Sequence, residues 1–147
     1  METIEDAPET ETIYVPIGAG FLGGGTTLAA KALKPSVKVV GVNSDAYPHF
    51  YESYKQGKPA QVERKYTLAD SITAPKTRDD MLRLLQYVLD DIVLVSEDMI
   101  KDSIRYLATE NKMFVEGAAA TTLAAALNED KEKLFVCARI LNNNMFE

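Results

Sequence analysis

The glycine-rich turn between positions 18 and 23 carries the residues best suited to chemistry. It follows a β-branched segment, precedes an Ala- and Leu-rich one, and reads Gly18, Ala19, Gly20, Phe21, Leu22 and Gly23. Unpaired N–H groups at a helix N-terminus attract anions, and glycine lets a phosphate approach the backbone. These six residues are therefore candidates for binding a phosphate group, although the same turn also suits close packing of a helix on a sheet.

The spacing of the turn also fits the dinucleotide-binding pattern G-x-G-x-x-G. That pattern expects an acidic residue about 20 positions further on, at the end of the next strand, to hold a ribose. Here the next apolar segment ends at Val42, Asn43 carries no charge, and Asp45 comes slightly too late. A structural turn, a phosphate site and a dinucleotide site are three interpretations that stay open.

Strand-like and helix-like segments alternate along the chain. Runs of β-branched residues predict strands at 12–17, 37–42, 92–95 and 134–140. Helical periodicity and alanine content predict helices at 26–33, 47–56, 78–89 and 116–127, and a further helix capped by Ser96. Residues 58–75 look irregular. This order predicts an α/β fold with a mostly parallel four-stranded sheet flanked by helices.

Length and charge narrow the function classes. The chain has 147 residues, a formal net charge of -6 and one cysteine. We expect one α/β domain over 12–147 and an acidic, flexible N-terminal tail over 1–11, which holds five acids and no base. No basic stripe points to nucleic acid, and no long apolar run points to a membrane span. The lone cysteine excludes an internal disulfide and suits a reducing, cytoplasmic location.

Several motifs, taken in order, resemble the threonine dehydratase and serine racemase family. The resemblance covers roughly residues 12–144. It rests on VPIGAGFL at 15–22, LAAKAL at 28–33, VKVVGV at 37–42, YES at 51–53, GKP at 57–59, TLAD at 67–70, DDIVLVS at 90–96 and FVEGAA at 114–119.

The resemblance implies a partial large domain of a fold-type-II pyridoxal-phosphate enzyme, namely the C-terminal half of its catalytic chain. In that family the lysine that forms a Schiff base with the cofactor lies in the N-terminal half. No lysine of this sequence stands at a corresponding position. We therefore expect weak binding of pyridoxal phosphate or none, and no catalytic residue in this chain.

Three sets of positions depart from the family pattern. The family's phosphate loop is four glycines, whereas Ala19 and Phe21 replace two of them here, and Phe21 would be strained if its φ were positive. The family's serine that bonds the pyridine nitrogen aligns with Leu141, in the run 141–144. The family's cation site aligns with Asn43, Tyr47 and His49, which are poor ligands for a hard cation. We expect no metal site, and His49 as a surface helix residue.

These observations leave three functional hypotheses. The first is a catalytically incompetent half-domain that serves as a binding or assembly module and self-associates as a dimer or larger. The second is one subunit of a split threonine or serine ammonia-lyase, which another chain with the N-terminal half completes. The third is a module that binds NAD or another phosphate-bearing ligand at the glycine turn.

Overall fold

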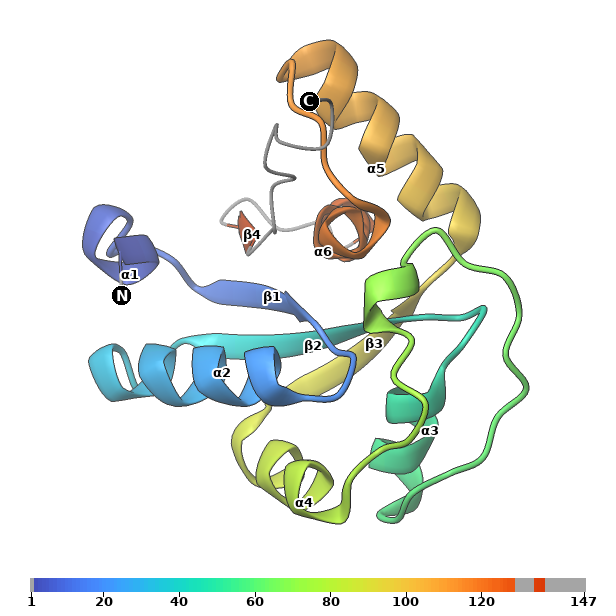
Figure 1. Ribbon diagram of the computed structural model, residues 1–147. Coiled ribbons are helices and arrows are strands. Elements are labelled where there is room, and N and C mark those ends of the chain that lie inside the picture. Colours follow the sequence, from blue (N-terminus) through green and yellow to red (C-terminus); the bar gives the residue numbers. More distant parts are fainter. Residues whose placement is uncertain (1, 129–133, 137–147) are drawn as a thin grey trace, which may run out of the picture.

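The computed structural model describes residues 2–128 and 134–136, and its centre is a parallel β-sheet (Figure 1). Three strands form most of the sheet, and they are β1 (Thr12–Pro16), β2 (Lys38–Ser44) and β3 (Asp91–Val95). The short strand β4 (Leu134–Val136) pairs with β1, which gives the order β3-β2-β1-β4. Every pairing is parallel, so the carboxyl ends of the strands lie at one edge of the sheet.

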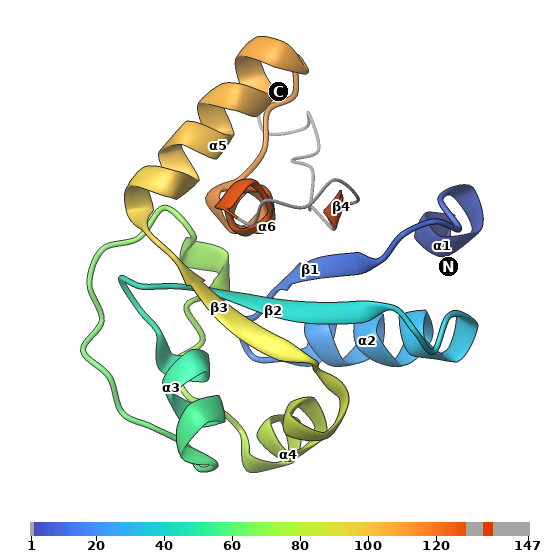
Figure 2. The same cartoon turned by 180° about the vertical axis from the view of Figure 1, so that it is seen from behind.

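Helices cover both faces of this sheet. One face carries α2 (Phe21–Leu33), α3 (His49–Gln56) and α4 (Asp79–Val88), and the other carries α5 (Glu97–Glu110) and α6 (Gly117–Asn128). The same two layers are seen from behind in Figure 2. A 3₁₀ turn, η1 (Asp70–Ile72), lies beside α6. The expected parallel α/β architecture is confirmed.

Side chains of β1 show why both faces must be covered. Alternate residues of a strand point to opposite faces. Ile13 and Val15 belong to the cluster under α2 and α4, whereas Tyr14 belongs to the cluster under α6. All three are fully buried. The continuous apolar run in the sequence therefore reflects a strand that is buried on both sides.

The first long helix begins earlier than its sequence indicates. We expected a helix over 26–33 after a glycine turn, but α2 begins at Phe21 and takes the glycines at 23–25 into its first turns. A Cβ at Gly23 would collide with Cδ1 of Ile17, and one at Gly24 would lie 3.2 Å from Cδ2 of Leu84. Two of these glycines thus let α2 pack closely, which offsets their poor helix propensity.

The ends of the chain differ from expectation in different ways. At the N-terminus, residues Glu2–Asp6 form a short helix, α1, instead of a structureless tail. The physical reason is Ile4, which is buried in the cluster under α2, while the Lys34 ammonium donates to the carbonyls of Pro8 and Thr10. Of the strand expected at 134–140, the described part is β4, and the rest lies outside the described residues. The division into tail and domain stays a prediction.

None of the described helices combines the length and apolar character that a membrane crossing requires.

The start of α6 is pressed against the backbone of a distant loop. A Cβ at Gly117 would overlap the carbonyl oxygen of Leu68, and it would lie 3.0 Å from the amide nitrogen of Ala69. Because these neighbours are backbone atoms held by their own hydrogen bonds, they cannot move aside cheaply. Gly117 therefore fixes how closely α6 approaches the segment that ends in η1.

We expect Gly117→Ala to lower the free energy of unfolding by about 1–3 kcal/mol, because it forces this contact apart. A matched control is Gly25→Ala in α2, where a Cβ would meet nothing within 4 Å. That change should raise stability by about 0.5–1 kcal/mol through helix propensity. Urea unfolding of both variants at one low protein concentration checks the contrast, and equal effects would contradict the close contact at Gly117.

Candidate functional site

A hollow of about 190 Å³ lies at the carboxyl end of β1, where the N-termini of α2 and α6 meet. We call it the turn cleft. Parallel sheets commonly bind ligands at this edge. Its lining residues are Pro16, Gly18, Ala19, Gly20, Phe21, Leu22, Ser71, Ile72, Glu116, Ala118 and Ala119. Five of the six residues predicted for phosphate binding therefore line one cleft, and the sixth, Gly23, packs inward against Ile17.

The backbone of the glycine turn is free of the strain that we expected at Phe21. Gly20 precedes α2 with a φ of 98°, a conformation that suits glycine. Among the described non-glycine residues only Lys112 has a positive φ, so Ala19 and Phe21 adopt ordinary backbone conformations. The glycine needed for the left-handed position is present, and the two substituted positions do not need one.

The side chain of Phe21 points away from the protein core. It is 60% exposed, and the Arg78 guanidinium lies 5.8 Å from the ring centroid. Arg78 is held in turn by Asp80 through two bonds of 3.0 and 2.7 Å. Phe21 is the first residue of α2, so its ring lies beside the N–H groups of the first helical turn. These groups have no intrahelical partner and can meet an anion.

Among the described residues that line the turn cleft, charge is limited to one carboxylate. Glu116 is the only ionisable residue of this described lining, and the Ser71 hydroxyl donates to its Oε1 at 3.2 Å. Within residues 2–128 and 134–136, no lysine, cysteine or histidine lines the cleft. The lining can therefore hold an anion through backbone N–H groups, but it offers no amine or thiol nucleophile.

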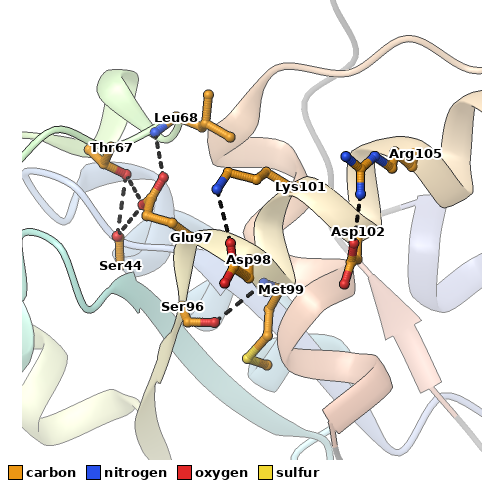
Figure 3. A network of polar contacts seen from close by, with 10 residues as sticks. All are labelled: Ser44, Thr67, Leu68, Ser96, Glu97, Asp98, Met99, Lys101, Asp102 and Arg105. Atoms are coloured by element: carbon orange, nitrogen blue, oxygen red, sulfur yellow. Dashed lines mark hydrogen bonds and ion pairs between the residues drawn. The ribbon is translucent and has the colours of Figure 1, made fainter.

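The wall formed by residues 67–72 is anchored by Glu97, in the first turn of α5 (Figure 3). Its Oε1 accepts from the hydroxyls of Ser44 at 2.9 Å and Thr67 at 2.5 Å, and its Oε2 accepts from the Leu68 N–H at 2.8 Å. We call this set the Glu97 clamp. It joins the end of β2, the irregular loop and α5, and hydrogen bonds to a charged acceptor are stronger than neutral ones.

Sequence reasoning missed the clamp. It placed Ser96 as a helix cap, which the Met99 N–H confirms by donating to the Ser96 hydroxyl at 3.3 Å. It treated the acid after Ser96 only as a favourable charge at a helix N-terminus. The clamp partners Thr67 and Ser44 lie 30 and 53 positions away, so no local spacing marks them.

His49 is buried, and our expectation of a surface residue is wrong. Only 2% of it is exposed, and its ring stacks on Tyr47 at 4.7 Å between centroids and meets the Phe50 ring edge-on at 6.4 Å. Its Nδ1 lies 3.4 Å from the Tyr47 carbonyl oxygen, and its Nε2 is buried without a hydrogen bond of good geometry. Burial lowers the pKa of His49, and the carbonyls of Tyr47 and Gly18 oppose that shift.

The other residues singled out from the family's cation site serve the fold. Asn43 is buried, donates to the Ile17 carbonyl at 2.9 Å and accepts from the Tyr51 N–H at 3.3 Å. Within the described part of the chain, no group of three or more His, Cys, Asp or Glu side chains could hold a metal ion. The run 141–144, aligned with the family's pyridine-binding serine, lies outside the described residues.

Asp45, the candidate ribose ligand, belongs to a different hollow. That hollow is lined by Asp45, Ala46, Lys65, Tyr66, Ser96, Glu97 and Asp98, and none of them lines the turn cleft. The geometry therefore does not bring the glycine turn and the acid of a dinucleotide site together.

Removal of the Glu97 charge should loosen the cleft wall. We expect Glu97→Gln to lower the free energy of unfolding by about 1–3 kcal/mol, because three donors would face a neutral amide. The control Asp98→Asn changes an exposed neighbour that pairs with Lys101 on the same helix, and it should leave the unfolding midpoint nearly unchanged. Chemical denaturation of both variants measures the difference in the free energy of unfolding. If Glu97→Gln left that free energy unchanged, the clamp would contribute nothing to stability.

The buried imidazole should make stability depend on pH. The pKa of His49 is lowered from 6.5, so the unfolded chain binds the proton more readily. The contribution of neutral, buried His49 to the free energy of unfolding is therefore complete above about pH 6.5. It is lost as the pH falls toward the folded-state pKa of His49. Because His49 is the only histidine, an NMR titration of its ring reports this pKa without ambiguity. A measured pKa of His49 at or above 6.5 in the folded protein would contradict its burial.

Comparisons with known proteins show which family this chain is similar to. A family described as "Pyridoxal-phosphate dependent enzyme" matches residues 1–135. L-threonine ammonia-lyase of Thermotoga maritima is 39% identical over 129 residues, which is 88% of this chain and 32% of that protein. The catabolic L-threonine dehydratase TdcB of Escherichia coli K12 is 34% identical over 128 residues, 87% of this chain and 39% of that protein.

Solved structures agree. Maize serine racemase superposes with a TM-score of 0.80 at 32% identity, covering 88% of this chain and 40% of that one. The T.th. threonine deaminase superposes with a TM-score of 0.82 at 28% identity, covering 92% of this chain and 51% of that one. The chain thus spans about a third of the length of the curated relatives it matches, and it belongs to the pyridoxal-phosphate dependent enzymes of fold type II as a threonine dehydratase-like partial domain.

Proposed function

We propose that this chain is a catalytically incompetent, threonine dehydratase-like half-domain that acts as a binding or assembly module in the cytoplasm. The observation that carries the proposal is the composition of the turn cleft. Its lining offers backbone N–H groups and one carboxylate, with no lysine among the described residues that form it. A site of this kind can anchor an anion, and it cannot bind an aldehyde covalently through an amine.

The family uses pyridoxal phosphate, so the fit of that cofactor can be judged part by part. The phosphate suits the first-turn N–H groups of α2 beside Gly20, whose positive φ and freedom from a Cβ keep the turn open. When bound in a complete enzyme, the cofactor withdraws electrons from an amino acid. Here no described cleft residue would hold its aldehyde, and Glu116 adds a negative charge nearby. The residues suit the phosphate and not the whole group, so they support anchoring alone.

The split-enzyme alternative keeps the same cleft and adds a companion chain that supplies the lysine. The Glu97 clamp and the contact at Gly117 hold the cleft wall without help from another chain, which is compatible with this alternative. No contact among the described residues favours it over the first hypothesis. The dinucleotide alternative is disfavoured because Asp45 lies outside the turn cleft.

Purified protein with pyridoxal phosphate should release no more 2-oxo acid from L-threonine or L-serine than the cofactor alone. The physical reason is the missing amine. Thermal unfolding in the same samples should show at most a small shift, and inorganic phosphate should reproduce it because only the anion is held. Turnover above the cofactor blank would contradict the proposal.

The anion site itself has a matched pair of variants. Ala19→Asp puts a carboxylate in the lining of the turn cleft and should abolish any phosphate-dependent thermal shift. Ala60→Asp makes the same change at another half-buried position, which lines a separate hollow with Tyr47 and Lys76, and it should keep the shift. If both variants keep the thermal shift, the phosphate binds outside the turn cleft.

A further inference from the structure

A second hollow, of about 530 Å³, lies between the start of α3, residues 59–62 and residues 75–77. We call it the loop hollow. In Figure 1 the chain leaves the end of α3, arches outward and returns to η1, and residues 59–62 belong to this arch. The volume falls within the range of roughly 300–1,000 Å³ that is usual for small-molecule sites. The loop hollow shares no lining residue with the turn cleft.

One buried serine ties together the three segments that frame the loop hollow. The Ser53 hydroxyl donates to the His49 carbonyl at 2.6 Å and accepts from the Ala60 N–H at 2.9 Å. It also lies 3.2 Å from the Thr77 hydroxyl. His49, Ala60 and Thr77 all line the hollow. Because these contacts exist within the chain, a ligand does not have to order the site when it binds.

The far end of the arch is fixed as well. The Lys65 N–H donates to the Ala46 carbonyl at 3.0 Å, and the Arg64 guanidinium donates to the Thr73 hydroxyl at 3.0 Å. The same guanidinium lies 5.9 Å from the centroid of the Tyr47 ring, which is part of the lining. The arch is therefore held on both sides of the loop hollow.

The lining combines apolar walls with a single charge. Its apolar members are Tyr47, Pro59, Ala60, Val62 and Pro75. Lys76 is the only charged residue of this described lining, and it makes no ion pair or hydrogen bond with another described residue. Burial lowers the pKa of His49 and keeps its ring neutral at pH 7, and its Nε2 has no hydrogen-bond partner among the described residues. The hollow therefore offers one unpaired cation beside an apolar surface.

Positive charge gathers around the loop hollow, against the balance of the whole chain. Residues 55–78 hold six basic and two acidic side chains, although the chain has a formal net charge of -6. A local surplus of one sign raises the concentration of oppositely charged ligands near it. The surroundings of the hollow thus favour an anion, as the unpaired Lys76 does.

We propose that the loop hollow binds a small monocarboxylate with an apolar or aromatic body. The single ammonium of Lys76 matches a single carboxylate, and the ring of Tyr47 with the two prolines gives the body an apolar wall. A bare phosphate would meet only one cation and would leave that wall in contact with water. The inference goes beyond the proposed function, which stands if the loop hollow proves empty.

An NMR titration of the full chain with benzoate, as the probe, tests the site. Benzoate should bind with a dissociation constant on the order of millimolar, as its size allows. The amides of residues 60–62 and 76–77 should shift, together with the ring signals of His49, the only histidine. Benzyl alcohol has the same ring without the charge and should bind at least about tenfold more weakly.

Two exposed lysines give a matched pair of variants. Lys76→Gln should weaken benzoate binding at least about tenfold, because it removes the cation of the lining. Lys58→Gln removes the same charge from the same arch, outside the lining, and should leave the affinity nearly unchanged. Both side chains are exposed, so thermal unfolding should show an intact fold in each variant.

The two hollows should also separate by ligand. Ala60→Asp should abolish the benzoate shifts and keep the phosphate-dependent thermal shift, whereas Ala19→Asp should do the reverse. Equal losses in Lys76→Gln and Lys58→Gln would overturn the site, because general attraction would then explain the binding. Benzoate shifts confined to the turn cleft, or no shifts at all, would overturn it too. Inorganic phosphate that moved the same signals with the same dependence on Lys76 would overturn the monocarboxylate as ligand.

Discussion

The Glu97 carboxylate is the contact on which the candidate site depends. It binds the end of β2 through Ser44 and the irregular loop through Thr67 and the Leu68 N–H, and it does so from the first turn of α5. Its charge lies where the dipole of α5 favours it. Without this carboxylate, three hydrogen-bond donors from two segments would lose a common acceptor.

The turn cleft follows from that anchor together with two glycine contacts. Gly117 brings α6 against the backbone of Leu68, and a Cβ at Gly18 would lie only 3.0 Å from Cα of Ile72. The wall at 67–72 is thus held from three sides, by α5, by α6 and by the glycine turn. A chain that spans about one third of the length of its curated relatives therefore holds this wall with its own residues.

Sequence reasoning predicted the features that local patterns determine. The glycine turn and the cap at Ser96 depend on neighbouring residues, and the parallel sheet follows from apolar strands that alternate with helices; the structure contains all three. The early start of α2 was missed because glycine is a poor helix former, and only the close approach of Ile17 explains it. His49, Ile4 and Glu97 were misjudged or missed because their surroundings come from distant segments, so their own sequence neighbours carried no signal.

The central claim is that this chain alone folds with a preformed cleft wall. Amide hydrogen exchange at Leu68 and Ala69 tests it most directly, since the Leu68 N–H donates to Glu97 and the Ala69 N–H donates to the Thr67 hydroxyl at 3.1 Å. Exchange of both amides in the isolated protein should be much slower than in exposed loops, because each amide donates to an acceptor within the clamp. Rapid exchange at these two amides, beside protected strands, would show that the wall forms only with a partner and would contradict the account.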